Sequence, residues 1–139
     1  MLEKSSEYEE LLEAVKKIVS NYRVDALIFF GSRARRNYKP WSDYDILITA
    51  DFKEKYLDRI GKILDLLSDL KIYVEPHPYT FDKAIEIFKK ENPTIVDALS
   101  EGLVLYTGEK FKELLKHYEE LLKRGLRKTE TSAIIPPST

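Results

Sequence analysis

Two aspartates, Asp43 and Asp45, stand two positions apart at the start of a predicted strand. Side chains alternate along a strand, so both carboxylates are expected to face the same way. Neighbouring carboxylates repel each other unless a cation lies between them, and oxygen-rich sites of this kind suit Mg²⁺ or Mn²⁺. The spacing therefore indicates a metal site. The alternative is a polar strand edge in which Asp43 only caps a turn.

A second feature is Gly31-Ser32, which ends an apolar run and opens a short helix. Glycine lets a phosphate approach the backbone, and a helix N-terminus offers free N–H donors and a favourable dipole. The Ser32 hydroxyl adds a donor, and Arg33, Arg35 and Arg36 bring positive charge. The pair predicts a seat for phosphate. Taken alone, it also fits an ordinary strand-to-helix turn, and each arginine fits a solvated helix face.

A third carboxylate, Glu75, follows the short apolar segment 72–74. If that strand lies beside the strand of the aspartates, Glu75 can reach them and either complete a metal shell or accept a proton. The alternative is a surface glutamate in a loop before Pro76. His77 lies two residues further on and can face the same way, but its flanking prolines favour an exposed loop residue.

These features are far more specific together than apart. A Gly-Ser pair, ten intervening residues and an Asp-x-Asp that opens a strand together resemble the signature of the polymerase-beta-like nucleotidyltransferase superfamily. The match is closest to the minimal nucleotidyltransferases (MNT), small proteins often encoded with a helical HEPN-domain partner. The resemblance covers residues 24–75 in motif and the whole chain in length and element order.

The resemblance implies roles for particular residues. In such proteins the Gly-Ser helix holds the nucleoside triphosphate, the two aspartates bind two divalent ions, and a third acid comes from a later strand. Here this implies a nucleotide site of Gly31, Ser32 and Arg33 and a catalytic metal site of Asp43, Asp45 and Glu75.

The chain departs from the family pattern at two positions. Arg36 stands where a glycine often closes the short helix, and Glu75 stands where the third acid is often aspartate. Neither change removes the Gly-Ser or Asp-x-Asp residues, so the resemblance still implies Mg²⁺ or Mn²⁺ as cofactor and ATP as the donor. The longer arm of Glu75 leaves open whether it binds metal, acts as a base or does neither.

The elements that must position these residues alternate between strands and helices. Apolar periodicity predicts helices at 5–21, 53–70, 81–88 and 111–122 and strands at 24–30, 44–49, 72–74 and 103–106. Residues 33–36 and 94–100 are expected to form short helical turns. Asp25 falls at the entrance of the first strand. We expect an α/β (α+β) fold, with a nucleotidyltransferase domain at 1–123 that has a mixed sheet of about four strands, and a flexible tail at 124–139.

Composition narrows the class further. The chain has 139 residues, enough for one domain, and its 23 basic and 24 acidic residues give a net charge of −1, which argues against bulk nucleic-acid binding. It has no cysteine, which excludes disulfides, zinc–thiolate sites and thiol nucleophiles. The N-terminus is charged and the apolar runs are short, so we expect a soluble cytoplasmic protein that is not bound to a membrane.

The predicted activity is transfer of AMP from ATP to a hydroxyl. The resemblance favours a protein acceptor, such as a tyrosine of a HEPN toxin, with the acceptor site completed by that partner or by a second copy of the chain. Two alternatives remain open at this point: an antitoxin that acts by contact alone, and a nucleotide-binding sensor without turnover.

Overall fold

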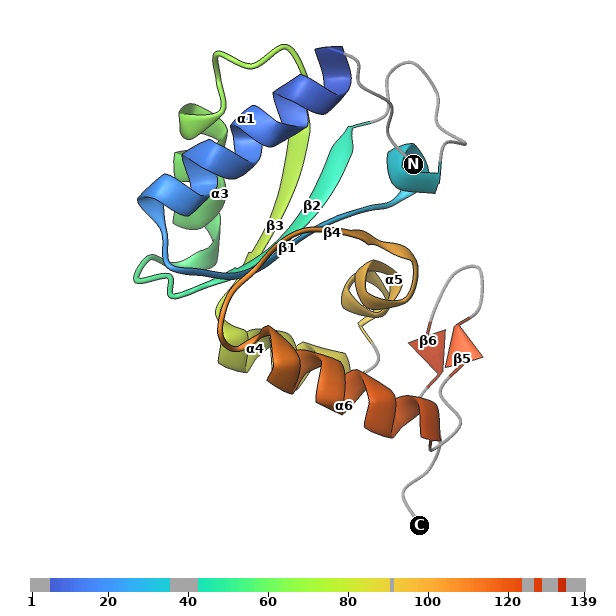
Figure 1. Ribbon diagram of the computed structural model, residues 1–139. Helices are drawn as coiled ribbons and strands as arrows, with labels where there is room; N and C mark the ends of the chain where they lie inside the picture. Colours follow the sequence, from blue (N-terminus) through green and yellow to red (C-terminus); the bar gives the residue numbers. More distant parts are fainter. Residues whose placement is uncertain (1–5, 36–42, 91, 124–126, 129–132, 135–139) are drawn as a thin grey trace.

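The computed structural model of the chain describes residues 6–35, 43–90, 92–123, 127–128 and 133–134, which form a mixed sheet covered by helices on both faces (Figure 1). In chain order the elements are α1 Ser6–Asn21, β1 Val24–Phe30, α2 Ser32–Arg35, β2 Tyr44–Ala50, α3 Tyr56–Leu66, β3 Val74–Tyr79, α4 Phe81–Lys89, α5 Pro93–Glu101, β4 Leu103–Thr107, α6 Phe111–Lys123, β5 Arg127–Lys128 and β6 Ala133–Ile134.

The main sheet has four strands in the order β3-β2-β1-β4. β1 pairs antiparallel with both β2 and β4, whereas β2 and β3 are parallel. All seven residues of β1 are buried, because this strand is internal in the sheet and both of its faces are covered. The expected mixed α/β fold with about four strands is confirmed.

Alternate residues of the internal strands serve two separate cores. Leu27 and Phe29 pack with residues of α1 and α3 on one face, and Ile28 and Phe30 pack with residues of α4 and α5 on the other. The ribbon shows the same division, with α1 and α3 on one side of the sheet and α4, α5 and α6 on the other (Figure 1). A side chain on β2 or β3 therefore has a defined face according to its position in the strand.

β3 differs from the prediction. The segment 72–74 was expected to be the strand and the prolines after it were expected to end it, but the strand runs from Val74 to Tyr79 and includes Pro76 and Pro78. The reason is that β3 is an edge strand, where proline is tolerated if its nitrogen faces away from the neighbouring strand. The outward-facing Pro78 carbonyl instead accepts a hydrogen bond from Arg59 at 3.3 Å.

Two helices also differ from the predicted bounds. α3 ends at Leu66 rather than near residue 70, and the hydroxyl of Ser68 donates to the Asp65 carbonyl at 2.8 Å, which competes with continuation of the helix. The turn expected at 94–100 is a nine-residue helix, α5. Asn92 caps it by accepting the Ile95 N–H at 3.2 Å, and Pro93 occupies its first turn.

The segment 124–139 was predicted to be a tail. Within it, Arg127–Lys128 and Ala133–Ile134 pair as two short antiparallel strands. None of the helices in the described part of the chain combines the length and apolar character needed to cross a membrane.

Candidate active site

The site lies at the end of the sheet where β1 finishes and β2 and β3 begin. Phe30 pairs with Asp45 across the antiparallel β1–β2 ladder, and Asp45 pairs with Glu75 across the parallel β2–β3 ladder. Three adjacent strands thus bring the Gly31 backbone, Asp45 and Glu75 to one edge. The condition under which Glu75 can reach the aspartates, that the third strand lies beside the second, is met.

Gly31 is fixed in place by its contact with Asp45. Its φ is +84°, a conformation that residues with a side chain rarely adopt. A Cβ at this position would lie 2.5 Å from the Asp45 Oδ2 atom. Only glycine therefore lets the turn into α2 pass directly over the carboxylate, which leaves Ser32 to begin the helix next to the acidic cluster.

The acidic cluster consists of Asp45, Glu75 and His77, whose potential ligand atoms all lie within 4.8 Å of one another. The His77 Nε2 atom lies 3.0 Å from an Asp45 carboxylate oxygen and 3.4 Å from a Glu75 carboxylate oxygen. Its ring also packs on Phe30, with 5.1 Å between ring centroids. The His77 imidazole thus lies between the Asp45 and Glu75 carboxylates, at the position where a cation shared by the two carboxylates is expected.

His77 was predicted to be an exposed loop residue, and this prediction was wrong. It lies in β3 with only 19% of its side chain exposed. Because Glu75 and His77 are two residues apart on one strand, they share a face with Asp45. The period-2 spacing carried this signal, but the flanking prolines outweighed it in the sequence argument.

The electrostatics of the cluster follow from carboxylate crowding. A hydrogen bond to Asp45 raises the pKa of Glu75, and burial and the negative charges of Asp45 and Asp43 raise it further, while His77 lowers it. In the absence of a bound cation, Asp45 and Glu75 therefore share a proton more readily than isolated carboxylates would.

The other predicted site residues are placed less centrally. Asp43 is exposed just before β2 and lies outside the three-residue cluster, although its charge acts on Glu75. The Arg33 guanidinium lies 4.6 Å from the centroid of the Tyr44 ring and 3.6 Å from a carboxylate oxygen of Glu7. Tyr44 packs on the α1 side of the sheet, and the role of Arg33 in nucleotide binding stays a prediction. Arg36 lies outside the described residues.

The donor set can be tested for its fit to a divalent cation. Two carboxylates and an imidazole from adjacent strands provide oxygen and nitrogen ligands without backbone rearrangement, and Asp43 adds a third carboxylate close by in sequence. Carboxylates suit Mg²⁺ and Mn²⁺, and imidazole shifts the preference toward transition metals. The residues present therefore fit a divalent metal site.

Comparison with known families agrees with this geometry. The family described as Nucleotidyltransferase domain matches residues 8–126, so the chain belongs to the nucleotidyltransferase domain family and is a transferase of that class. No curated protein sequence matches the chain.

Solved structures of toxin–antitoxin complexes share the fold. A mutant of the MntA–HpeT toxin–antitoxin aligns with a TM-score of 0.55 at 16% identity, over 81% of this chain and 86% of that chain. A toxin–antitoxin with AMP-PNP gives 0.51 at 13% identity, over 83% and 86%. The MNT antitoxin complex with tri-AMPylated HEPN toxin from Shewanella oneidensis gives 0.50 at 14% identity, over 86% and 88%. The family match confirms the resemblance to nucleotidyltransferases, and these solved structures show that the chain shares their fold.

Proposed function

We propose that this chain transfers a nucleoside monophosphate, AMP from ATP, to a hydroxyl of a protein acceptor: the hydroxyl oxygen bonds to the α-phosphate and pyrophosphate leaves. One observation carries the proposal: the Gly31 turn, Asp45 and Glu75 meet at one edge of three adjacent strands, in contact with one another. This edge offers a backbone turn for phosphates and a carboxylate cluster for divalent metal within the same few ångströms.

The residues of the chain divide the work as follows. Gly31 and Ser32 hold the β- and γ-phosphates, while Asp45 and Glu75, with His77 and Asp43, hold two Mg²⁺ or Mn²⁺ ions. When bound there, the ions supply charge neutralisation at the attacking and leaving oxygens. Glu75 is also accessible, with 56% of its side chain exposed, and its carboxylate can accept the proton of the attacking hydroxyl.

The accessibility of the cluster supports a macromolecular acceptor. Glu75 is half exposed and Asp43 is exposed, so a hydroxyl displayed on another protein surface can approach the reacting phosphate. The fold neighbours include a complex in which an MNT antitoxin accompanies a tri-AMPylated HEPN toxin. We therefore propose a tyrosine hydroxyl of a HEPN-type partner as the acceptor.

The test is label transfer from α-labelled ATP with Mg²⁺, with and without the protein encoded by the neighbouring gene as candidate acceptor. We expect the partner to become labelled by the wild-type chain. Asp45→Asn should lower transfer at least about a hundred-fold because it removes the central metal carboxylate. Asp65→Asn, which removes an exposed carboxylate on α3, should behave like the wild type.

Three other outcomes would overturn parts of the proposal. A partner that binds tightly but is never labelled would favour an antitoxin acting by contact alone. Metal-dependent ATP binding without transfer to any acceptor would favour a nucleotide sensor. Equal labelling by Asp45→Asn and the wild type would remove the carboxylate cluster from the mechanism.

A further inference from the structure

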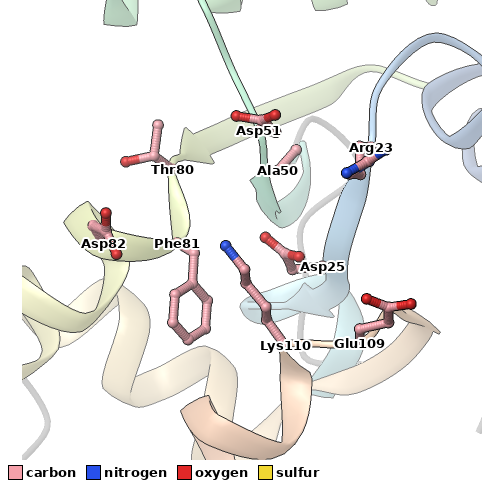
Figure 2. Close-up of a pocket in the computed structure, with 9 residues that line it drawn as sticks. All are labelled: Arg23, Asp25, Ala50, Asp51, Thr80, Phe81, Asp82, Glu109 and Lys110. Carbon is pink, nitrogen blue, oxygen red and sulfur yellow. The ribbon is translucent and has the colours of Figure 1, made fainter.

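A polar cavity lies at the opposite end of the strands from the carboxylate cluster. It has a volume of about 580 Å³ and is lined by the start of β1, the end of β2, the start of α4 and the turn between β4 and α6. Figure 2 shows Asp25 and Lys110 turned into this space, beside the Phe81 ring. None of these residues belongs to the proposed active site.

Asp25 is the unusual group in this cavity. Its relative exposure is only 9%, because the turn after β4 lies directly on its backbone. The Gly108 N–H donates to the Asp25 carbonyl at 2.6 Å, and a Cβ on Gly108 would lie 2.4 Å from the Val24 carbonyl oxygen. The close approach of Gly108 thus removes one side of Asp25 from water and leaves the cavity as its remaining exposure.

The Asp25 carboxylate has no direct hydrogen-bonded or ion-paired partner among the described residues, although the positive charges of Lys110 and Arg23 act on it from a distance. Lys110 lies over the Phe81 ring, with 5.4 Å from its amine to the ring centroid. A buried carboxylate without a hydrogen-bond donor is costly unless a cation supplies one. Burial accordingly raises the pKa of Asp25.

The residues that line the cavity carry a net negative charge, the same sign as Asp25. Four acidic side chains but only two basic ones line the cavity, and one of the acids, Asp51, is already paired with Lys53 at 3.1 Å. The carboxylates are also dispersed: in the described part of the chain, only the Asp45 cluster brings three potential ligand atoms within 4.8 Å of one another. The cavity therefore suits an extended organic cation better than a metal ion.

We propose that this cavity is a binding site for a small aliphatic amine or guanidine, whose cationic head group forms a charge-assisted hydrogen bond with the Asp25 carboxylate. The Phe81 ring provides an apolar wall for the carbon chain, and the remaining acids compensate a second positive charge. Binding there requires neither the metal nor the nucleotide of the active site.

The test uses butane-1,4-diamine as probe, with butane-1,4-diol as its uncharged match at equal ionic strength. We expect the diamine to raise the melting temperature of the metal-free wild-type chain and to give a saturable calorimetric isotherm, and the diol to do neither. Asp25→Asn should weaken diamine affinity by about ten- to hundred-fold. Asp58→Asn, which removes an exposed acid on α3, should leave the affinity unchanged.

A second measurement does not depend on any variant. The amide signal of Gly108 reports on the Asp25 backbone, so it should move on titration with diamine and stay fixed with diol. The proposal is overturned if the diamine produces no saturable binding, if Asp25→Asn binds it as well as the wild type, or if signals move evenly over all acidic surfaces. Because the assay contains no ATP, it gives its answer whether or not nucleotidyl transfer is found.

Discussion

The two ends of the central strands solve the problem of placing carboxylates in a protein in different ways. At one end Asp45 and Glu75 are crowded together, partly open to solvent, with His77 between them. At the other end Asp25 is buried and without a hydrogen-bond donor among the described residues, and the other acids of its cavity are dispersed. Clustered carboxylates suit a small divalent ion, whereas dispersed carboxylates around a cavity suit an organic cation.

The difference between the two ends originates in how Gly31 packs on Asp45 and how Gly108 packs on Asp25. Gly31 passes over the Asp45 side chain, so its lack of a Cβ leaves space for the carboxylate itself. Gly108 lies instead against the backbone of Asp25, so its lack of a Cβ allows the chain to cover the residue. The Gly31 contact leaves the Asp45 carboxylate accessible to a ligand of substrate size. The Gly108 contact leaves Asp25 accessible only from the cavity.

The largest expected effect comes from breaking the first of these contacts. Gly31→Ala should lower nucleotidyl transfer by at least about a hundred-fold, because the new Cβ must displace the Asp45 carboxylate and such small displacements are costly to catalysis. It should also reduce the free energy of unfolding by about 1–3 kcal/mol, since φ is +84°. Transfer assays and chemical denaturation measure the two effects.

The matched control is Gly61→Ala in α3, where a new Cβ meets no atom within 4 Å. This change should stabilise the helix by about 0.5–1 kcal/mol and leave transfer unchanged. If Gly31→Ala retained full activity, the contact between the turn and Asp45 would not matter for the reaction.

Much of this arrangement could be predicted from the sequence, since Gly31, Asp45 and Glu75 each end or begin an apolar run. The pairing of Asp45 with Glu75 needs the order of the strands, which depends on tertiary packing. The family resemblance implied only that the third acid comes from a later strand. His77 was missed because proline usually ends a strand, and an edge position removes that restriction.

Contacts between residues far apart in the sequence could not be predicted either, because they also depend on tertiary packing. The sequence left Arg33 either near phosphate or on a solvated helix face, and it could not show the contacts of Arg33 with Glu7 and Tyr44, which depend on how α1 crosses the sheet. The burial of Asp25 likewise depends on a turn more than eighty residues later in the chain. Local patterns identify charged residues, and only the packing of distant elements decides which of them remain without a partner.

A change of intermediate size tests whether His77 takes part in metal binding. His77→Gln should weaken Mn²⁺ by about ten- to hundred-fold and Mg²⁺ by less, because imidazole favours transition metals. Metal-induced shifts in melting temperature measure both affinities without turnover. His117→Gln on α6 changes the other histidine and should alter neither affinity. An equal loss for both metals would mean that His77 only orients the carboxylates.

The smallest expected effect is on the pH dependence of the free energy of unfolding of the metal-free protein, to which Asp25 and Glu75 contribute separately. Burial raises the pKa of Asp25 above its value in the unfolded chain, so the folded state holds its proton to higher pH. Stability should therefore fall as pH rises from the unfolded pKa, near about 3.9, through the raised one, and the loss should persist at neutral pH. Asp25→Asn should regain about 1 kcal/mol at pH 7 and nothing near pH 3.

Glu75 should show the same sign but a different response to metal. Its pKa is raised mainly by the hydrogen bond to Asp45, so stability should again fall as pH rises through its titration. A divalent ion between the Asp45 and Glu75 carboxylates removes the reason for them to share a proton. Mg²⁺ should therefore abolish the contribution of Glu75 to the pH dependence of stability, which is the contribution that Glu75→Gln also removes. Mg²⁺ should leave the Asp25 part unchanged, because the Asp25 cavity offers no clustered ligands. Denaturation curves of wild type, Asp25→Asn and Glu75→Gln with and without Mg²⁺ separate the two contributions, and a Mg²⁺ response in the Asp25 part would show that the two ends are not chemically distinct.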